Sequence, residues 1–286
     1  MTGLPDVPDL YAALRQSGTA PEGLEALIAA SPPAVQTRLA TIDRGLMRAI
    51  LRAGQGLPPV ETGPAIIRAL HAATPALLFD PALLAGPVIA LPTRGERPEM
   101  PAFSDPAFDA WFTATGASHG IGLYGEDRRV YASAQFADSA SPERRTIHLG
   151  LDVFAPAGTP VYAPFAGRVH LLTYNADPLD YGHTLILRHD LGGCAFFTLY
   201  GHLGASLPRL LAPGAEVAAG QHIADLGDWP ENGGWAPHLH FQIVTDMLEQ
   251  TGNFFGVGHR SLWDVWQSIS PDPNLILRLP ATAFAL

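Results

Sequence analysis

Two short segments of the chain combine histidine with a carboxylate or with a second histidine. The first is His148-Leu-Gly-Leu-Asp152, and the second, far downstream, contains His238 and His240 separated by one leucine. Side chains alternate faces along an extended strand, so each pair is expected to share one face while the apolar neighbours point the other way. Two such strands side by side would bring three or four nitrogen and oxygen donors to one point. Zinc prefers this donor set.

Further motifs lie between the two segments in a definite order. They are Gly-Thr-Pro-Val-Tyr-Ala (158–163), Gly-Arg-Val (167–169), Tyr-Gly-His-Leu (200–203) and Gly-Gln (220–221). The whole succession closely resembles the LytM/lysostaphin-type zinc metallopeptidases, whose motifs run HxxxD, GTPVxA, GxV, YxHL, GQ and HLHF. In a chain with 11 histidines one such motif is weak evidence, whereas six in order are specific.

The resemblance implies roles for five residues. Carried over by position, the metal ligands are His148, Asp152 and His240, and the catalytic histidines that bind no metal are His202 and His238. It also implies Zn²⁺ as cofactor, a β-sheet groove, and hydrolysis of peptide bonds in peptidoglycan-type or related peptides. The metal would activate a water while the two histidines transfer protons. Which histidine acts as base and which as acid stays open.

Other polar residues near the motifs have weaker claims. Tyr200 lies two positions before His202, which predicts either a role in orienting the site or a place in the core. The remaining histidines have no ligand spacing and are expected to be structural, with His183 the least certain because it follows a polar loop. They are His71, His119, His170, His183, His189, His222 and His259.

Three stretches bear on specificity. The turn 227–235 carries two tryptophans and two acids where relatives have a compact Gly/Ser/Thr-rich stretch, which predicts a narrower and more acidic groove wall. Gln242 follows the HLHF motif, where many relatives have glutamate. The charged stretches 125–131 and 143–145 are expected to be solvated turns, with an arginine that meets a substrate carboxylate as the alternative.

The elements that must position these residues predict an α+β fold. Helices are expected at 10–16, at 21–30, over a long stretch from 31 to 54, and at 63–74. The long helix carries apolar residues at helical spacing, and we expect this stripe to pack in the core rather than bind a partner. Short β-rich runs from 161 to 244, separated by turns, predict an antiparallel sheet or partial barrel.

These expectations divide the chain into four parts. Residues 1–85 are a helical region, 86–119 a Pro-rich connector, 120–250 a LytM-like zinc metallopeptidase β domain, and 251–286 an aromatic-rich C-terminal extension. The connector contains too many aromatic residues for a free linker, so it is expected to wrap the next domain in an ordered way.

Composition restricts the function further. The 286 residues are 47% hydrophobic and 15% charged, as in a globular protein, and the net charge of −10 argues against a nucleic-acid partner. No apolar run is long enough for a membrane span, and Cys194 is the only cysteine. No secretory signal is visible, which predicts a cytoplasmic protein, or a periplasmic one if an export signal has been removed. The oligomeric state stays open.

Two alternatives remain beside the peptidoglycan-type peptidase. One is a metallohydrolase of the same fold that acts on a non-peptidoglycan amide, which the altered turn 227–235 and the missing signal favour. Those features resemble a branch in which such modules occur beside aminotransferase- or kinase-like domains in cytoplasmic proteins. The other is a non-hydrolytic LytM-like binding or regulatory module. Such modules typically lack ligand residues, whereas all five matching residues are present in this chain.

Overall fold

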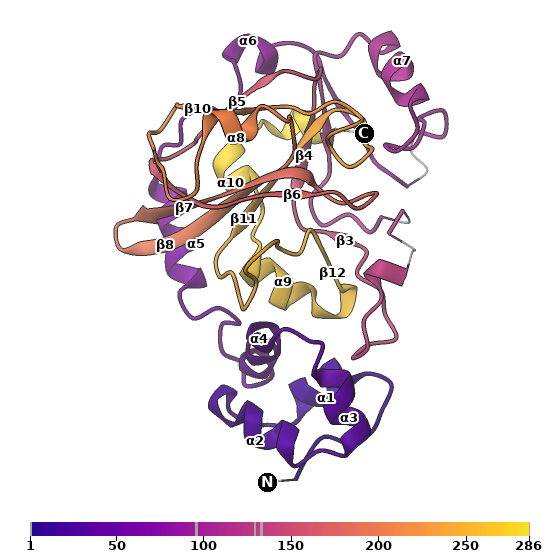
Figure 1. Cartoon of the computed structure of the whole chain (residues 1–286), viewed down its shortest axis with the longest axis vertical. Helices are drawn as coiled ribbons and strands as arrows, with labels where there is room; N and C mark the ends of the chain where they lie inside the picture. Colours follow the sequence, from indigo (N-terminus) through magenta and orange to yellow (C-terminus); the bar gives the residue numbers. More distant parts are fainter. Residues whose placement is uncertain (1, 95–96, 129, 132–133, 286) are drawn as a thin grey trace.

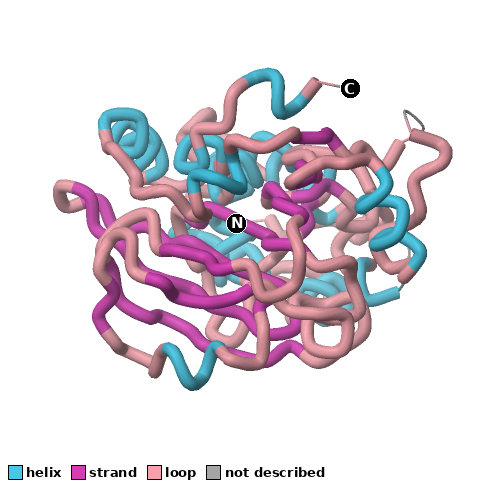
Figure 2. Tube along the Cα trace, turned by 90° about the horizontal axis from the view of Figure 1, so that it is seen from above, coloured by secondary structure: helices cyan, strands magenta, loops and turns pink. Residues whose placement is uncertain are grey.

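The computed structural model describes residues 2–94, 97–128, 130–131 and 134–285. The first four helices gather at one end of the molecule, and the sheet, with helix α9 beside it, forms the larger part above them (Figure 1). Viewed from above, the strands run side by side (Figure 2). The predicted α+β class is therefore confirmed.

The helices fall mainly before residue 115 and after residue 260. The α-helices are α1 (Leu10–Gln16), α2 (Leu24–Ala29), α3 (Pro33–Leu39), α4 (Arg44–Gly54), α5 (Gly63–Ala72), α6 (Pro81–Leu84), α7 (Ala107–Ala114), α8 (Leu207–Leu210), α9 (Trp263–Ile269) and α10 (Asn274–Leu277). The 3₁₀-helices are η1 (Pro21–Gly23), η2 (Ala134–Phe136), η3 (Arg260–Leu262) and η4 (Ala281–Phe284).

The strands occupy the middle of the chain. They are β1 (Val88–Ala90), β2 (His119–Gly122), β3 (Ile147–His148), β4 (Leu151–Phe154), β5 (Pro160–Tyr162), β6 (Gly167–Asn175), β7 (Gly182–Leu191), β8 (Cys194–Leu203), β9 (Glu216–Val217), β10 (His222–Asp225), β11 (His238–Val244) and β12 (Val257–Gly258). Among the described residues one large sheet has the order β1-β2-β4-β11-β8-β7-β6-β9, and β10 pairs with β5 and β12 with β3 in two smaller sheets. Only the β1–β2 pair is parallel in this part of the chain.

Both faces of the central strands β4, β11, β8 and β7 are largely buried, which explains their nearly continuous apolar sequences, whereas β6 is mostly exposed or half-buried. Leu185 and Leu187 of β7 face a cluster with α5, β5 and β10, whereas Ile186 faces a second cluster with the N-terminal helices and α9. The apolar residues of 31–54 lie in that second cluster, so the predicted packing role is confirmed. The N-terminal helices thus support the face of the sheet opposite α5.

The prediction of one long helix from 31 to 54 is wrong. The structure has two helices, α3 and α4, with the chain turning at residues 40–43. Asp43 begins α4 because its side chain accepts a hydrogen bond from the Leu46 N–H, at 3.0 Å, which caps the helix. The apolar spacing continues across the break because both helices bury their apolar sides in the same cluster.

Several elements lie in the stretches predicted as connector and C-terminal extension. The stretch 86–119 contains β1, which joins the edge of the large sheet, and α7, whose Phe108 is buried against Phe154 of β4. The C-terminal stretch contains α9, whose Trp266 is fully buried. The division into domains at the stated boundaries stays a prediction.

Candidate metal centre

Strand β11 brings the two histidine-bearing segments together. It lies between β4 and β8, and His240 is paired with Asp152 on one side and with Gly201 on the other. The side chain of His240 therefore lies next to that of Asp152 and near the end of β8, where His202 is located. A long-range strand pairing thus produces the juxtaposition that the sequence motifs predict.

His148 reaches the same point from a different strand. The expectation that His148 and Asp152 share one strand is wrong, because β3 ends at His148 and pairs with β12, whereas β4 begins at Leu151. The chain turns at Leu149 and Gly150. A Cβ at Gly150 would lie only 2.4 Å from Cε1 of His240, so this turn passes too close to the His240 ring for any other residue.

The three predicted ligands converge within hydrogen-bonding distance of one another. His148 Nε2 and His240 Nδ1 each lie 3.2 Å from Asp152 Oδ1 and 3.0 Å from each other. All three side chains are almost completely buried. Together they form a group that could hold a metal ion.

Hydrogen bonds on the far side of each ring fix which nitrogen faces this point. His148 Nδ1 lies 2.8 Å from the carbonyl oxygen of Leu123, so Nδ1 carries the proton and donates it. His240 Nε2 donates to Gln242 Oε1 at 3.0 Å, because the Gln242 amide nitrogen is already directed at Phe255 O and Ser270 Oγ. In the neutral ring the bond to Gln242, which departs from the family pattern, therefore leaves Nδ1 of His240 as the nitrogen without a proton.

Three lone pairs therefore face one another without a proton between them. Such an arrangement is repulsive alone and becomes favourable around a cation. Tetrahedral zinc with bonds of about 2.0 to 2.1 Å separates its ligand atoms by about 3.3 Å, close to the distances seen here. Two neutral imidazoles and one carboxylate also match the three protein ligands of a zinc site that keeps a fourth position open. The residues present fit Zn²⁺.

Arg128 neutralises the back of the Asp152 carboxylate. Its Nη1 donates to Asp152 Oδ2 at 2.7 Å, and its Nε donates to Glu126 at 3.0 Å. Arg128 is buried, so the expectation of a solvated turn is wrong at this residue, while Arg129 lies outside the described residues. Because Oδ2 is occupied, the oxygen presented to the two histidines is Oδ1.

His202 and His238 lie beside the three predicted ligands with their rings 4.2 Å apart between centroids. His202 Nδ1 donates to the carbonyl oxygen of Asn232, and His238 Nδ1 donates to that of Ala236, each at 2.7 Å. These bonds leave Nε2 as the basic nitrogen of both rings. His238 Nε2 lies 3.9 Å from Asp152 Oδ1, which is just beyond hydrogen-bonding distance.

Burial keeps these histidines neutral near pH 7. It lowers the pKa of His148 to about 4, with Arg128 contributing, and it lowers the pKa of His238 to about 4. The pKa of His202 also lies well below its usual value, first because of burial and then because of His238. Burial acts to raise the pKa of Asp152, but the charge and hydrogen bond of the Arg128 guanidinium act against it, and that pKa lies well below its ordinary value.

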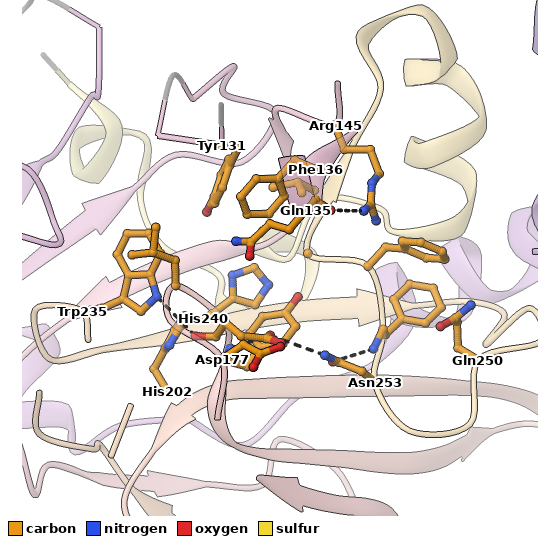
Figure 3. Close-up of a pocket in the computed structure, with 17 residues that line it drawn as sticks. Tyr131, Gln135, Phe136, Arg145, Asp177, His202, Trp235, His240, Gln250 and Asn253 are labelled. Atoms are coloured by element: carbon orange, nitrogen blue, oxygen red, sulfur yellow. Dashed lines mark hydrogen bonds between the residues drawn. The ribbon is translucent and has the colours of Figure 1, made fainter. Parts of the chain in front are cut away.

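A pocket of about 290 Å³ opens beside the cluster (Figure 3). His202 and His240 line it, together with Trp235 and Tyr181. Tyr181 packs its ring 5.1 Å from that of His240, and its buried Oη has no hydrogen-bond partner among the described residues. The sequence pointed to the loop before β7 through His183, but Tyr181 is the residue of this loop that reaches the site.

The structure decides one open alternative and corrects one expectation about the site. Tyr200 belongs to the core, where its Oη accepts from Thr198 Oγ1, because the backbone at His202 has φ of +63° and breaks the alternation of the strand. Asp228 and Glu231 do not line the pocket. Glu231 instead accepts hydrogen bonds from the N–H groups of Ala205 and Asp228.

None of the seven histidines expected to be structural belongs to the group of three residues that could hold a metal ion. Two of them have clear structural partners: His183 stacks on Tyr174, and His189 bonds Thr198 and the Ala166 carbonyl. His259 lies 3.2 Å from Asp138 and is fully buried. None of the described helices is long and apolar enough to cross a membrane.

Comparison with known proteins places the site in a defined segment. The sequence pattern of Peptidase family M23 matches residues 146–251. Peptidoglycan DD-endopeptidase ShyC of Vibrio cholerae is 34% identical over 103 residues, which are 36% of this chain and 21% of that protein. DD-carboxypeptidase/endopeptidase Mpg of Neisseria meningitidis is 33% identical over 96 residues, 34% of this chain and 20% of that protein.

Among solved structures, a zinc-containing peptidase from Vibrio cholerae matches with 32% identity and a TM-score of 0.29, over 35% of this chain and 28% of that one. The matching part of the chain spans a third or less of the length of the curated relatives that it matches in sequence. The segment 146–251 carries all five motif residues in the family order. This segment of the chain therefore matches peptidase family M23, and its motifs follow the LytM/lysostaphin order.

Proposed function

We propose that this domain is a zinc-dependent metallopeptidase. The observation that carries the proposal is the convergence of three unprotonated donor atoms, His148 Nε2, Asp152 Oδ1 and His240 Nδ1, at one point beside a pocket. Bound zinc would supply Lewis-acid polarisation of the scissile carbonyl and activation of the attacking water. The protein residues would then have to bind the peptide and move the protons.

His202 and His238 are suited to move those protons. Each donates Nδ1–H to a backbone carbonyl and keeps an unprotonated Nε2 directed at the site, so each can accept a proton from the attacking water and return it to the leaving amine. Their lowered pKa values keep them in the basic form at neutral pH. Tyr181, whose Oη lacks a partner among the described residues, can donate to the developing oxyanion.

The substrate class we favour is a peptide of peptidoglycan type. The names of two relatives, a peptidoglycan DD-endopeptidase and a DD-carboxypeptidase/endopeptidase, support this choice. The alternative is a non-peptidoglycan amide, which the replacement of a small-residue turn by Trp235 in the pocket favours. A purely binding module is disfavoured because all five motif residues are present. Cytoplasmic location stays a prediction.

Hydrolysis of matched substrates separates these functions. We expect zinc-loaded protein to cleave cross-linked muropeptides, detected by chromatography and mass spectrometry, and the His238→Ala protein to retain zinc but lose cleavage by a factor of about 100 or more. Cleavage of other short peptides alone would favour the amide alternative. Binding of muropeptides without cleavage by the zinc-loaded wild type would favour the binding module.

A further inference from the structure

The pocket beside the three predicted metal ligands has charges of opposite sign on opposite sides. Arg145 is the only lysine or arginine among the described residues that line it, while Asp177 and Asp180 line it as well. In Figure 3 His240 lies between Arg145 on one side and Asp177 and Asn253 on the other. A ligand that reaches the metal cluster therefore lies between a positive and a negative group.

Arg145 is held in place by neutral groups. Its backbone N–H donates to Phe136 O, its Nη2 donates to Gln135 O at 3.0 Å, and its guanidinium carbon lies 5.3 Å from the centre of the Phe255 ring. Cation–π and carbonyl contacts orient the guanidinium without neutralising its charge. The position is therefore fixed in advance of any ligand.

The charge of Arg145 is left without an anion in the part of the chain that the structure describes. Its Nε is buried without a hydrogen-bond partner. The carboxylate with the strongest electrostatic effect on Arg145 is that of Asp138. This carboxylate already accepts hydrogen bonds from the Tyr11 hydroxyl and the Ala140 N–H. Burial lowers the pKa of Arg145, and the charge of Asp138 does not offset the hydration that the guanidinium has lost.

Arg128 provides the contrast within the same site. It is also buried and also lies near an aromatic ring, that of Phe103, but it contacts the carboxylates of both Asp152 and Glu126. Its position is accounted for by the protein alone. Arg145 has no such pair of carboxylates, although its guanidinium has the planar fork that binds carboxylates well.

The opposite side of the pocket is suited to a cation. Asp180 is partly buried, and its Oδ1 accepts only from neutral groups, the Tyr181 N–H at 2.7 Å and Asn253 Nδ2 at 3.5 Å. Burial, with a contribution from Asp177, raises the pKa of Asp180. An ammonium group of a ligand would relieve the repulsion between these two acids.

We propose that Arg145 is the carboxylate-binding residue of the substrate pocket, and that Asp177 and Asp180 receive an amino group of the same ligand. The preferred substrate is then a zwitterionic peptide that carries a free carboxylate and a free amine close to the scissile bond, because one pocket of about 290 Å³ contains both poles and His240. This inference rests on the proposed peptidase function and adds the substrate class.

The test compares short peptides and muropeptides, each prepared with its carboxylates free and as carboxamides. Cleavage by the zinc-loaded wild type and equilibrium binding to zinc-loaded His238→Ala protein are measured separately by mass spectrometry and calorimetry. We expect the free acids to be favoured about 10- to 100-fold in kcat/KM and in affinity, the range of a charge-assisted hydrogen bond. Acetylation of the amine should weaken binding in the same direction.

Variants assign the preference to one side chain. Arg145→Gln should abolish the difference between acid and amide, and Arg145→Lys should retain part of it. Arg144→Gln is the matched control, because Arg144 is the exposed neighbour and does not line the pocket. Thermal unfolding confirms that each variant is folded.

The possible outcomes distinguish a failure of the carboxylate-binding role from a failure of the proposed peptidase function. Cleavage of acid and amide at equal kcat/KM would overturn the carboxylate-binding role and leave the peptidase function intact. An acid preference in binding that depends on Arg145, without cleavage by the wild type, would support the carboxylate-binding role and overturn the peptidase function. Equal affinity for acid and amide, including no detectable binding of either, would overturn the inference.

Discussion

At the scale of single residues, the site depends on hydrogen bonds that determine which atom of each proposed ligand faces inward. Leu123 O and Gln242 Oε1 take the outward protons of His148 and His240, and Arg128 takes the outward oxygen of Asp152. Outer partners of this kind fix ring orientation and basicity in metal sites. The inward-facing atoms are therefore preorganised before any metal binds.

Arg128 gives a prediction about stability. Replacing it by methionine leaves Asp152 and Glu126 buried without a countercharge, so we expect metal-free protein to lose about 3 to 5 kcal/mol of unfolding free energy. Arg168→Met, which removes the exposed pair with Glu216, should cost less than about 1 kcal/mol. Urea unfolding measures both, and equal small losses would contradict the assigned role.

The five motif residues were predictable because short-range spacing and motif order are visible in a sequence. The contacts of Arg128 and Tyr181 were not, because both depend on loops that approach the site from elsewhere in the chain. The charged stretch around Arg128 has the composition of a solvated turn. Only the position of Asp152 behind it makes burial of this arginine favourable.

At the scale of elements, the close turn between β3 and β4 positions the proposed ligands His148 and Asp152. Gly150 is required because a Cβ at this residue would lie within 2.4 to 2.9 Å of three atoms of the His240 ring. We expect Gly150→Ala to displace the ring and weaken zinc binding by roughly 10- to 100-fold, measured by competition with a chromophoric chelator. Gly252→Ala is the control, since its Cβ would meet nothing within 4 Å. Unchanged affinity in Gly150→Ala would show that the turn tolerates a side chain.

Element boundaries were predicted well where a local signal exists. Asp9 caps α1, and that helix spans the predicted residues 10–16. The break between α3 and α4 was missed because the apolar periodicity persists through it, although Asp43 carries a cap signal. The separation of β3 from β4 could not be derived from alternation alone, because the turn between them lies against the His240 ring, which comes from a strand far away in the sequence.

At the scale of the whole molecule, four histidines and one aspartate from three distant segments of the sequence are buried together where β4, β11 and β8 lie side by side. Which face of the sheet the N-terminal helices would cover was not predictable, because both faces of β7 and β8 are apolar. The fold class was predictable from the change from helical to strand periodicity along the chain.

Burial of neutral histidines predicts how stability depends on pH. Because the pKa of His148 and of His238 is held at about 4, against about 6.5 in an unfolded chain, the unfolded state takes up protons first as the pH falls. The unfolding free energy of metal-free protein should therefore be highest above pH 6.5 and fall between pH 6.5 and 5. His238→Phe should reduce this slope. A flat profile over that range would contradict the neutral, buried state of these rings.

The most direct test of the central claim is the zinc content of purified protein after dialysis, measured by plasma mass spectrometry. We predict about one zinc ion per chain in the wild type and in His238→Ala, and almost none in His240→Ala. Of these two histidines, only His240 supplies one of the three converging donor atoms. Full zinc content in a folded His240→Ala protein, or none in the wild type supplied with zinc, would contradict it.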